Sequence, residues 1–205
     1  GVYEFKSKWN VTEYKYFYYN RIEKSEILRL SKKDILDLIV KIPSFESRNH
    51  NLIRFCNDNF KNIFMSTGTS TWDEIKLSAN LVDKEKLILL HCVSAYPCEP
   101  ENANLLKIKF LKDAMLSKSV GYSDHIVGVE SAKVAMSSGI SVIEKHFTID
   151  KELPGRDNKF AILPHELKEL KDFIDLYYNM HNWHGDGFLS IELKSRNEYS
   201  GRFNS

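Results

Sequence analysis

The sequence lacks a surplus of charge and has no long apolar run. Its 29 lysines and arginines nearly balance 28 aspartates and glutamates, which leaves a formal net charge of +1 over 205 residues. Such a chain has no overall positive field to attract nucleic acid or an anionic membrane surface, so we predict neither partner. No stretch reaches the roughly 18 apolar residues of a membrane-spanning helix. The first residues also lack the pattern of a secretory signal, which favours a cytoplasmic protein.

Cysteine is scarce as well. The three cysteines form no Cys-x-x-Cys pair in a chain too long to depend on disulfide bonds, so Cys56, Cys92 and Cys98 are predicted to be reduced thiols. The segment from His91 to Cys98 could form a soft-metal site, although metal-binding cysteines usually come in closer, repeated pairs. The remaining composition, with 42% hydrophobic and 28% charged residues, is that of an ordinary globular domain.

From Val40 onward the sequence repeats one plan, in which a short apolar run is followed by polar residues and an amphipathic helical stretch. The apolar runs lie at 39–44, 63–68, 87–92, 120–125 and 142–147. Helices are expected at 50–60, 71–82, 102–117, 128–138 and 164–180. Two helix starts have local signals, because Thr71 and Glu74 have capping-box spacing and Pro164 suits a first helical turn. The alternation predicts an α/β fold with a parallel sheet and right-handed crossovers.

The two ends of the chain depart from this plan. Residues 1–39 form a divergent amino-terminal segment whose aromatic run at 9–19 favours packing or loop residues over a base-stacking platform. The folded domain is predicted over 40–180, and residues 181–205 are predicted to be a tail with a mobile end. His181 and His184 in this tail could bind a metal, but a Gly/Asp-rich loop favours surface histidines.

Each apolar run ends in polar side chains that can support chemistry. The carboxyl ends of parallel strands meet at one face, where α/β proteins bind their ligands. The five ends carry, in chain order, Ser44, then Ser66 to Gly68, then His91 with Ser94 and Tyr96, then Ser123 to His125, then Glu144 to His146. The pattern predicts a functional site at this face.

Two neighbouring strand ends carry histidines. His125 and His146 suit a divalent metal with open coordination positions, whereas either one alone would favour a hydrogen-bonded rim histidine. Asp124 and Glu144 add carboxylates beside them. The two-residue period of a strand places Glu144 and His146 on one face and Lys145 on the other. Glu144 is therefore a candidate partner of the metal site or a general acid or base.

A second group of side chains suits phosphate. The run from Ser66 to Gly68 offers short hydroxyl donors and lets the backbone come close to a ligand, although the same residues are common in turns. Lys41 adds a positive charge. Beside a metal, this combination predicts a phosphorylated anionic substrate whose charge the metal and the lysine share.

Six segments together resemble one family. They are Lys41-Ile-Pro-Ser44, Ser66-Thr-Gly68, His91-Cys-Val-Ser-Ala-Tyr-Pro97, Gly121-Tyr-Ser-Asp-His125, Glu144-Lys-His-Phe-Thr148 and Pro154-Gly-Arg-Asp157. In this order they resemble the sialic acid synthase (N-acetylneuraminate synthase) family, which includes the legionaminic and pseudaminic acid synthases. The resemblance is good from residue 40 to 175 and faint before it. It implies an incomplete TIM-type (β/α) barrel, with about five of the eight strands recognisable.

The resemblance also implies an activity. Members are transferases of sialic acid biosynthesis that condense phosphoenolpyruvate with an N-acylated amino sugar of the N-acetylmannosamine type, giving a nine-carbon 2-keto acid and phosphate. It implies a divalent cation, Mn²⁺ or Mg²⁺, held by His125 and His146, in agreement with the Lewis-acid chemistry expected of such a pair. Glu144 matches an acidic active-site residue that could act as acid, base or orienter. Positions that match phosphoenolpyruvate contacts are Lys41, Ser44, Ser66 and Ser123, and those that match sugar contacts are Ser94, Tyr96 and Asp157.

The sequence also departs from the family. Motifs of its first three strands are missing, residues 31–39 run directly into the motif of the fourth strand, and no antifreeze-like domain follows. This predicts a truncated and internally shortened chain with weak or no turnover, in which a homodimer would cover the open sheet edges. Two alternatives stay open: a non-catalytic remnant that binds a metal or an anionic sugar, and a different phosphoenolpyruvate-dependent 3-deoxy sugar acid synthase. The loop with Asp157 favours the sialic type.

Overall fold

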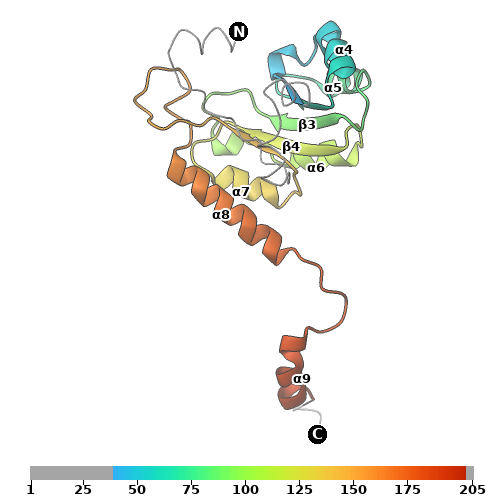
Figure 1. Ribbon diagram of the computed structural model, residues 1–205, viewed down its shortest axis with the longest axis vertical. Coiled ribbons are helices and arrows are strands. Elements are labelled where there is room, and N and C mark those ends of the chain that lie inside the picture. The colour runs from blue at the N-terminus through green and yellow to red at the C-terminus, as the bar shows by residue number, and fades with distance from the viewer. Residues whose placement is uncertain (1–38, 202–205) are drawn as a thin grey trace, which may run out of the picture.

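The computed structural model describes residues 39–201 (Figure 1), so the predictions for 1–38 and for the end of the tail lie outside the described residues. Five strands form one parallel sheet in the order β1-β2-β3-β4-β5. The strands are β1 (Ile39–Ile42), β2 (Asn62–Ser66), β3 (Leu87–Cys92), β4 (Ser119–Asp124) and β5 (Ile143–Lys145). The helices are α4 (His50–Asn59), α5 (Trp72–Ala79), α6 (Leu106–Asp113), α7 (Glu130–Met136), α8 (Pro164–Met180) and α9 (Leu193–Tyr199), with 3-10 turns η1 (Ser44–Glu46), η2 (Pro100–Asn102) and η3 (Ser190–Glu192).

The sheet is curled. Strand order follows the sequence without the reversal that marks a doubly wound sheet. In a flat sheet, four strand spacings of about 4.8 Å would hold β1 and β5 about 19 Å apart. Instead, Lys41 of β1 donates a hydrogen bond to Glu144 of β5 over 2.7 Å. The described strands therefore form a curled half-barrel, which confirms the predicted incomplete TIM-type (β/α) barrel.

Alternate strand residues face the two sides of this half-barrel. The outward residues pack under the helices in the largest core cluster, and full burial of each large apolar side chain contributes about 1.5–3 kcal/mol. Examples are Ile63, Met65, Leu87, Leu89 and Val120. The inward residues form a smaller separate cluster of Phe64, Ile88 and Leu90 with Ile39 and Val142 against it. The apolar runs are thus hydrophobic on both faces, as expected for a parallel sheet.

Local signals explain where two helices begin. At α5 the Thr71 hydroxyl accepts from the Glu74 amide over 3.3 Å, and the Glu74 carboxylate accepts from the Thr71 amide over 2.8 Å. This confirms the predicted capping box. Pro164 is the first residue of α8, as predicted. Leu170 on α8 packs against Val129 and Ala132 beside the sheet, so the first half of α8 joins the helical layer.

The chain beyond α8 runs away from the sheet and ends in α9 (Figure 1). The sequence pattern does not predict η3 or α9, whose residues are exposed. The domain boundaries drawn at residues 40 and 180 stay predictions. None of the helices in the described part of the chain is both long and apolar enough to cross a membrane.

Candidate active site

The inner face of the half-barrel changes from apolar to polar toward the carboxyl ends of the strands. Side chains two residues apart on a strand share a face. The inward positions that follow the apolar inner cluster are Lys41, Ser66, Cys92, Ser123 and Glu144, and the next inward positions on the last two strands are His125 and His146. The predicted site residues on the strands therefore meet at one mouth, the usual ligand side of a (β/α) barrel.

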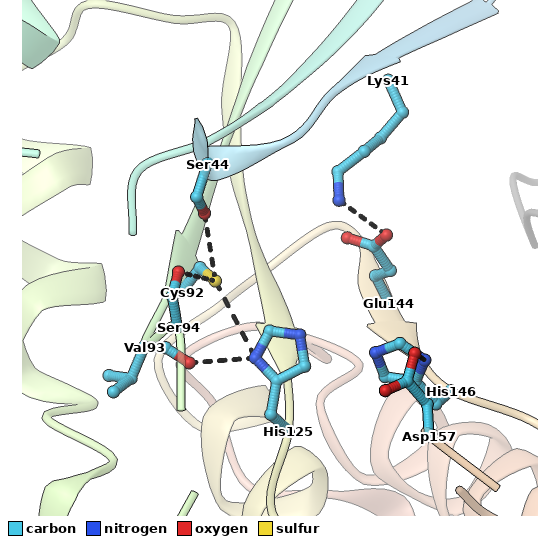
Figure 2. A network of polar contacts seen from close by, with 9 residues as sticks. All are labelled: Lys41, Ser44, Cys92, Val93, Ser94, His125, Glu144, His146 and Asp157. Carbon is cyan, nitrogen blue, oxygen red and sulfur yellow. Dashed lines mark hydrogen bonds and ion pairs between the residues drawn. The ribbon is translucent and has the colours of Figure 1, made fainter. Parts of the chain in front are cut away.

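Lys41 and Glu144 close this mouth between the first and last strands (Figure 2). The lysine Nζ lies 2.7 Å from Oε1 of the carboxylate, and the two side chains are 24% and 28% exposed. The other carboxylate oxygen, Oε2, is buried without a hydrogen bond to any described residue. A buried carboxylate oxygen normally has a partner, so this atom is suited to accept a hydrogen bond from a ligand.

Two serines and a cysteine converge above Gly68. Ser44 donates to the Cys92 sulfur over 3.5 Å, and the Ser94 hydroxyl lies 3.8 Å from the same sulfur (Figure 2). A Cβ on Gly68 would stand 2.3 Å from the Ser94 hydroxyl and 2.6 Å from the Ser44 hydroxyl, so only glycine leaves room for them. Ser66 nearby in sequence has a buried hydroxyl with no partner among the described residues. The cluster offers short hydroxyl donors to a small anion.

His125 is held in one tautomer. Its Nδ1 lies 2.9 Å from the carbonyl oxygen of Val93, which can only accept, so Nδ1 carries the proton. In the neutral ring Nε2 then presents a lone pair, the arrangement typical of a metal-binding histidine. The His125 and His146 ring centroids lie 5.5 Å apart. Figure 2 shows that the nitrogens not engaged with Val93 or Asp157 lie on the facing sides of the two rings.

The surroundings shift the pKa of both histidines. Burial alone would lower the pKa of His125, but its contact with Cys92 and its bond to the Val93 carbonyl outweigh burial and raise it. For His146 burial prevails and lowers the pKa, although Asp157, whose Oδ2 lies 3.8 Å from Nδ1, opposes that change. His125 is thus the more basic ring, and His146 favours its neutral form.

Cys92 contacts Ser44, Ser94 and His125 in the polar cluster, although the sequence predicts only a reduced thiol or a soft-metal ligand at this position. Burial raises the pKa of this thiol, yet its contact with His125 at 3.9 Å and the hydrogen bond from Ser44 outweigh burial and lower it overall. The two-residue period of β3 could have indicated this position, because it places Cys92 on the same face as Ile88 and Leu90. All three cysteines are free, as predicted, and all three are buried.

The described side chains fit a divalent cation in part. The two histidine nitrogens suit a cation that keeps its remaining positions for water or substrate. Across residues 39–201, no group of three or more histidine, cysteine, aspartate or glutamate side chains is arranged to hold a metal. Glu144 engages Lys41 instead of the histidines. Asp124, expected beside the metal, is turned to the outer face, where it binds Lys145. The prediction that Asp124 lies beside the metal site is therefore wrong.

Aromatic rings form a wall beside the histidines. The Tyr96 ring lies 4.1 Å from the His125 ring, and the Phe160 ring lies 5.2 Å from the His146 ring, centroid to centroid. Burial raises the pKa of the Tyr96 hydroxyl, which keeps it a hydrogen-bond donor at neutral pH. Asp157 stands at the same side, next to His146. An apolar wall with polar tips is the kind of surface that binds a sugar.

One other residue expected at this face lies elsewhere. His91 is on the outer side of β3, where its Nε2 lies 2.8 Å from the carbonyl oxygen of Ala103 and its ring stacks on Tyr122. Its position follows from the strand period, because Leu87 and Leu89 also face outward. The expectation that His91 contributes to the mouth is therefore wrong.

The fold and the mouth define a class: an incomplete TIM-type barrel protein with polar and ionisable side chains gathered at the carboxyl ends of its strands. More narrowly, the chain belongs to the NeuB family, whose pattern it matches over residues 25–186. The family resemblance inferred from the six sequence segments is thereby confirmed.

Several relatives are similar to this chain. The N,N'-diacetyllegionaminic acid synthase of Campylobacter jejuni is 39% identical over 137 residues, 64% of this chain and 41% of that protein. A pseudaminic acid synthase of the same species is 35% identical over 158 residues, 76% of this chain and 45% of that protein. A solved structure of an N-acetylneuraminic acid (sialic acid) synthetase from Leptospira borgpetersenii, in complex with citrate, has a TM-score of 0.70 at 33% identity and covers 78% of this chain and 58% of that one. The chain thus spans less than half the length of both curated relatives.

Proposed function

We propose that this protein condenses phosphoenolpyruvate with an N-acylated amino sugar of the N-acetylmannosamine type, giving a nine-carbon sialic-type 2-keto acid and phosphate. One observation carries the proposal: a lysine and serine group suited to an anion meets a histidine pair at a single barrel mouth. The names of the similar synthases support the same reaction class.

The anionic substrate would lie over the serine cluster. Lys41 uses one of its three donors on Glu144, so its other donors are available to a phosphate or carboxylate group. The hydroxyls of Ser44 and Ser94, which converge on Gly68, and the unpartnered hydroxyl of Ser66 would supply short donors to the anion. A positive charge and several hydroxyls would together stabilise the phosphate as it leaves.

The histidine pair would hold the cation. His125 Nε2 and a nitrogen of His146 are the ligands, and Mn²⁺ or Mg²⁺ is the ion proposed. When bound, the cation would polarise the sugar aldehyde as a Lewis acid. The Val93 carbonyl orients His125 by accepting its Nδ1 proton. The Cys92 sulfur lies 3.9 Å from the same Nδ1 atom of His125.

The sugar would lie against the aromatic wall. Tyr96 offers a ring face and a hydroxyl donor, and Asp157 offers a carboxylate to sugar hydroxyls. Lys41 occupies Oε1 of Glu144, so Oε2 is the atom that would accept a proton from water or from a sugar hydroxyl. Glu144 is therefore the proposed acid or base of the reaction.

The test is phosphate release from phosphoenolpyruvate plus N-acetylmannosamine with Mn²⁺. The chain is compared with His125→Ala, His146→Ala and the surface control Lys109→Met. We expect release that needs the sugar, survives in the control and disappears in both histidine variants. Release without sugar, or with full rate in the histidine variants, would overturn the proposal.

Two further outcomes separate the alternatives. Binding of Mn²⁺ by a folded chain without turnover would support the non-catalytic remnant, since this chain spans less than half of its curated relatives. Release with arabinose or erythrose phosphates in place of N-acetylmannosamine would identify a 3-deoxy sugar acid synthase. Cytoplasmic location and dimerisation stay predictions.

A further inference from the structure

A buried ion pair lies directly behind the two histidines. Asp124 and Lys145, whose Oδ2 and Nζ are 2.8 Å apart, have side chains 0% and 5% exposed. They are the residues immediately before His125 and His146, and they face each other as the last paired residues of β4 and β5. The pair sits on the outer side of the sheet, and the histidines sit on the inner side.

This pair is part of a complete network. Asp124 Oδ1 accepts the amide of Ile126 over 2.9 Å, and Oδ2 accepts the hydroxyl of Ser131 over 2.6 Å. Lys145 also donates to the carbonyl oxygen of Ile126 over 2.7 Å. The end of β4, the end of β5 and the first turn of α7 are therefore joined at one point.

The network lies where the pairing of β4 and β5 ends, directly before the two histidines. Strand pairing between β4 and β5 ends at Asp124 and Lys145, and β5 is only three residues long. Each histidine extends one residue beyond this last pair. The relative position of the two rings therefore depends on how firmly the last pair is held, because a peptide unit fixes where the next side chain begins.

We propose that the Asp124–Lys145 pair sets the spacing of His125 and His146 and so tunes their affinity for a divalent cation. This inference rests on the proposed function, because it concerns the same histidine pair. Asp124 and Lys145 touch neither the cation nor the substrate and act through the backbone, so they are positioning residues.

The test is Mn²⁺ affinity, measured from the electron paramagnetic resonance signal of free Mn²⁺ in a titration of the 205-residue chain. The double variant Asp124→Asn, Lys145→Met removes both charges together and avoids leaving one charge buried alone. We expect its dissociation constant for Mn²⁺ to rise about tenfold, the scale seen when supports of metal ligands are lost. Thermal unfolding of the metal-free variant should stay cooperative.

A matched control removes an exposed ion pair that does not adjoin either histidine. Lys109 and Asp113 form an exposed pair on α6 at 2.6 Å, and the variant Lys109→Met, Asp113→Asn should bind Mn²⁺ as the parent chain does. Ser131→Ala is a milder variant that removes one hydrogen bond to Asp124, and we expect it to fold even if the double variant does not. Its dissociation constant should rise about threefold.

The outcomes are distinct. An affinity in the double variant and in Ser131→Ala equal to that of the parent would overturn the positioning role and leave the proposed function standing. Equal weakening in the Lys109 and Asp113 control would do the same, since the effect would then be one of general stability. A parent chain that binds no Mn²⁺, with a folded far-ultraviolet spectrum, would overturn the metal site itself and the inference with it.

Discussion

The two faces of the same five strands differ in how their charged groups are satisfied. On the outer face the Asp124–Lys145 pair is buried and every charged atom has a partner. On the inner face the Lys41–Glu144 pair is about a quarter exposed, and one carboxylate oxygen has no partner among the described residues. The outer pair is therefore fully satisfied within the fold, whereas the inner pair keeps a carboxylate oxygen that is suited to accept a hydrogen bond from a ligand.

The largest expected effect is on stability at the outer face. Lys145→Met leaves the Asp124 carboxylate buried without its cation, and such a loss typically costs about 3–5 kcal/mol of unfolding free energy. Urea unfolding followed by circular dichroism measures this difference. A loss below about 1 kcal/mol, as for a surface pair, would remove the contrast between the two faces.

The next effect concerns ligand binding above Gly68. Gly68→Ala brings a methyl group within 2.6 Å of the Ser44 and Ser94 hydroxyls and displaces both. We expect the affinity for phosphoenolpyruvate to fall about tenfold, which is about 1.4 kcal/mol, because both donors move. Isothermal titration of the metal-free chain measures it, and Gly187→Ala is a matched control because no atom lies near that position. Unchanged affinity in Gly68→Ala would place the anion elsewhere.

A smaller effect on the stability of the protein is expected when the inner Lys41–Glu144 pair is broken. Lys41→Met should change the unfolding free energy by less than about 1 kcal/mol, since the pair is partly solvated. The same variant should bind phosphoenolpyruvate more weakly, because the lysine charge is lost. Unfolding and titration on one preparation give both values. A large loss of stability with unchanged phosphoenolpyruvate binding would show that the inner pair, like the outer pair, stabilises the fold.

The smallest effect tests a surface feature of the helical layer. The backbone hydrogen bond from Thr71 lowers the pKa of Glu74, whose ordinary value is 4.5. A carboxylate whose pKa is lowered by folding adds stability at any pH above its pKa in the unfolded chain. This stability disappears as the pH falls through the pKa of the folded state. The melting temperatures of Glu74→Ala and the parent should therefore differ at pH 7 and converge as the pH falls from 4.5 through the lowered pKa of Glu74. A difference that persists in acid would argue against the ionised capping box.

Much of the fold could be predicted from the sequence. Each of the five strands overlaps its apolar run, although β2 and β4 begin one residue earlier. The five helices from α4 to α8 lie within the expected ranges, because both signals are local. Helix α9 was missed since its exposed residues show no apolar stripe to detect. The sequence also places a histidine at the end of each of two neighbouring strands, and the structure brings the two ring centroids to 5.5 Å from each other.

The site itself was predicted only in part. The strand period separates Glu144 from Lys145, and the structure confirms that they face opposite sides. The same period applies to His91 and Cys92, yet His91 was expected at the mouth and Cys92 was expected to be a reduced thiol or part of a soft-metal site. The structure reverses their roles, because Cys92 shares the inner face with Leu90.

The sequence by itself determined the order of strands and helices, the alternation of faces and the identity of the polar residues at each strand end. Only the tertiary structure decided which face is the inside of the barrel and how far the sheet curls. That curl joins Lys41 to Glu144, which are 103 residues apart in the chain. The physical reason is that periodicity is local, whereas the choice of the inner face and the closure of the mouth depend on contacts between all five strands at once.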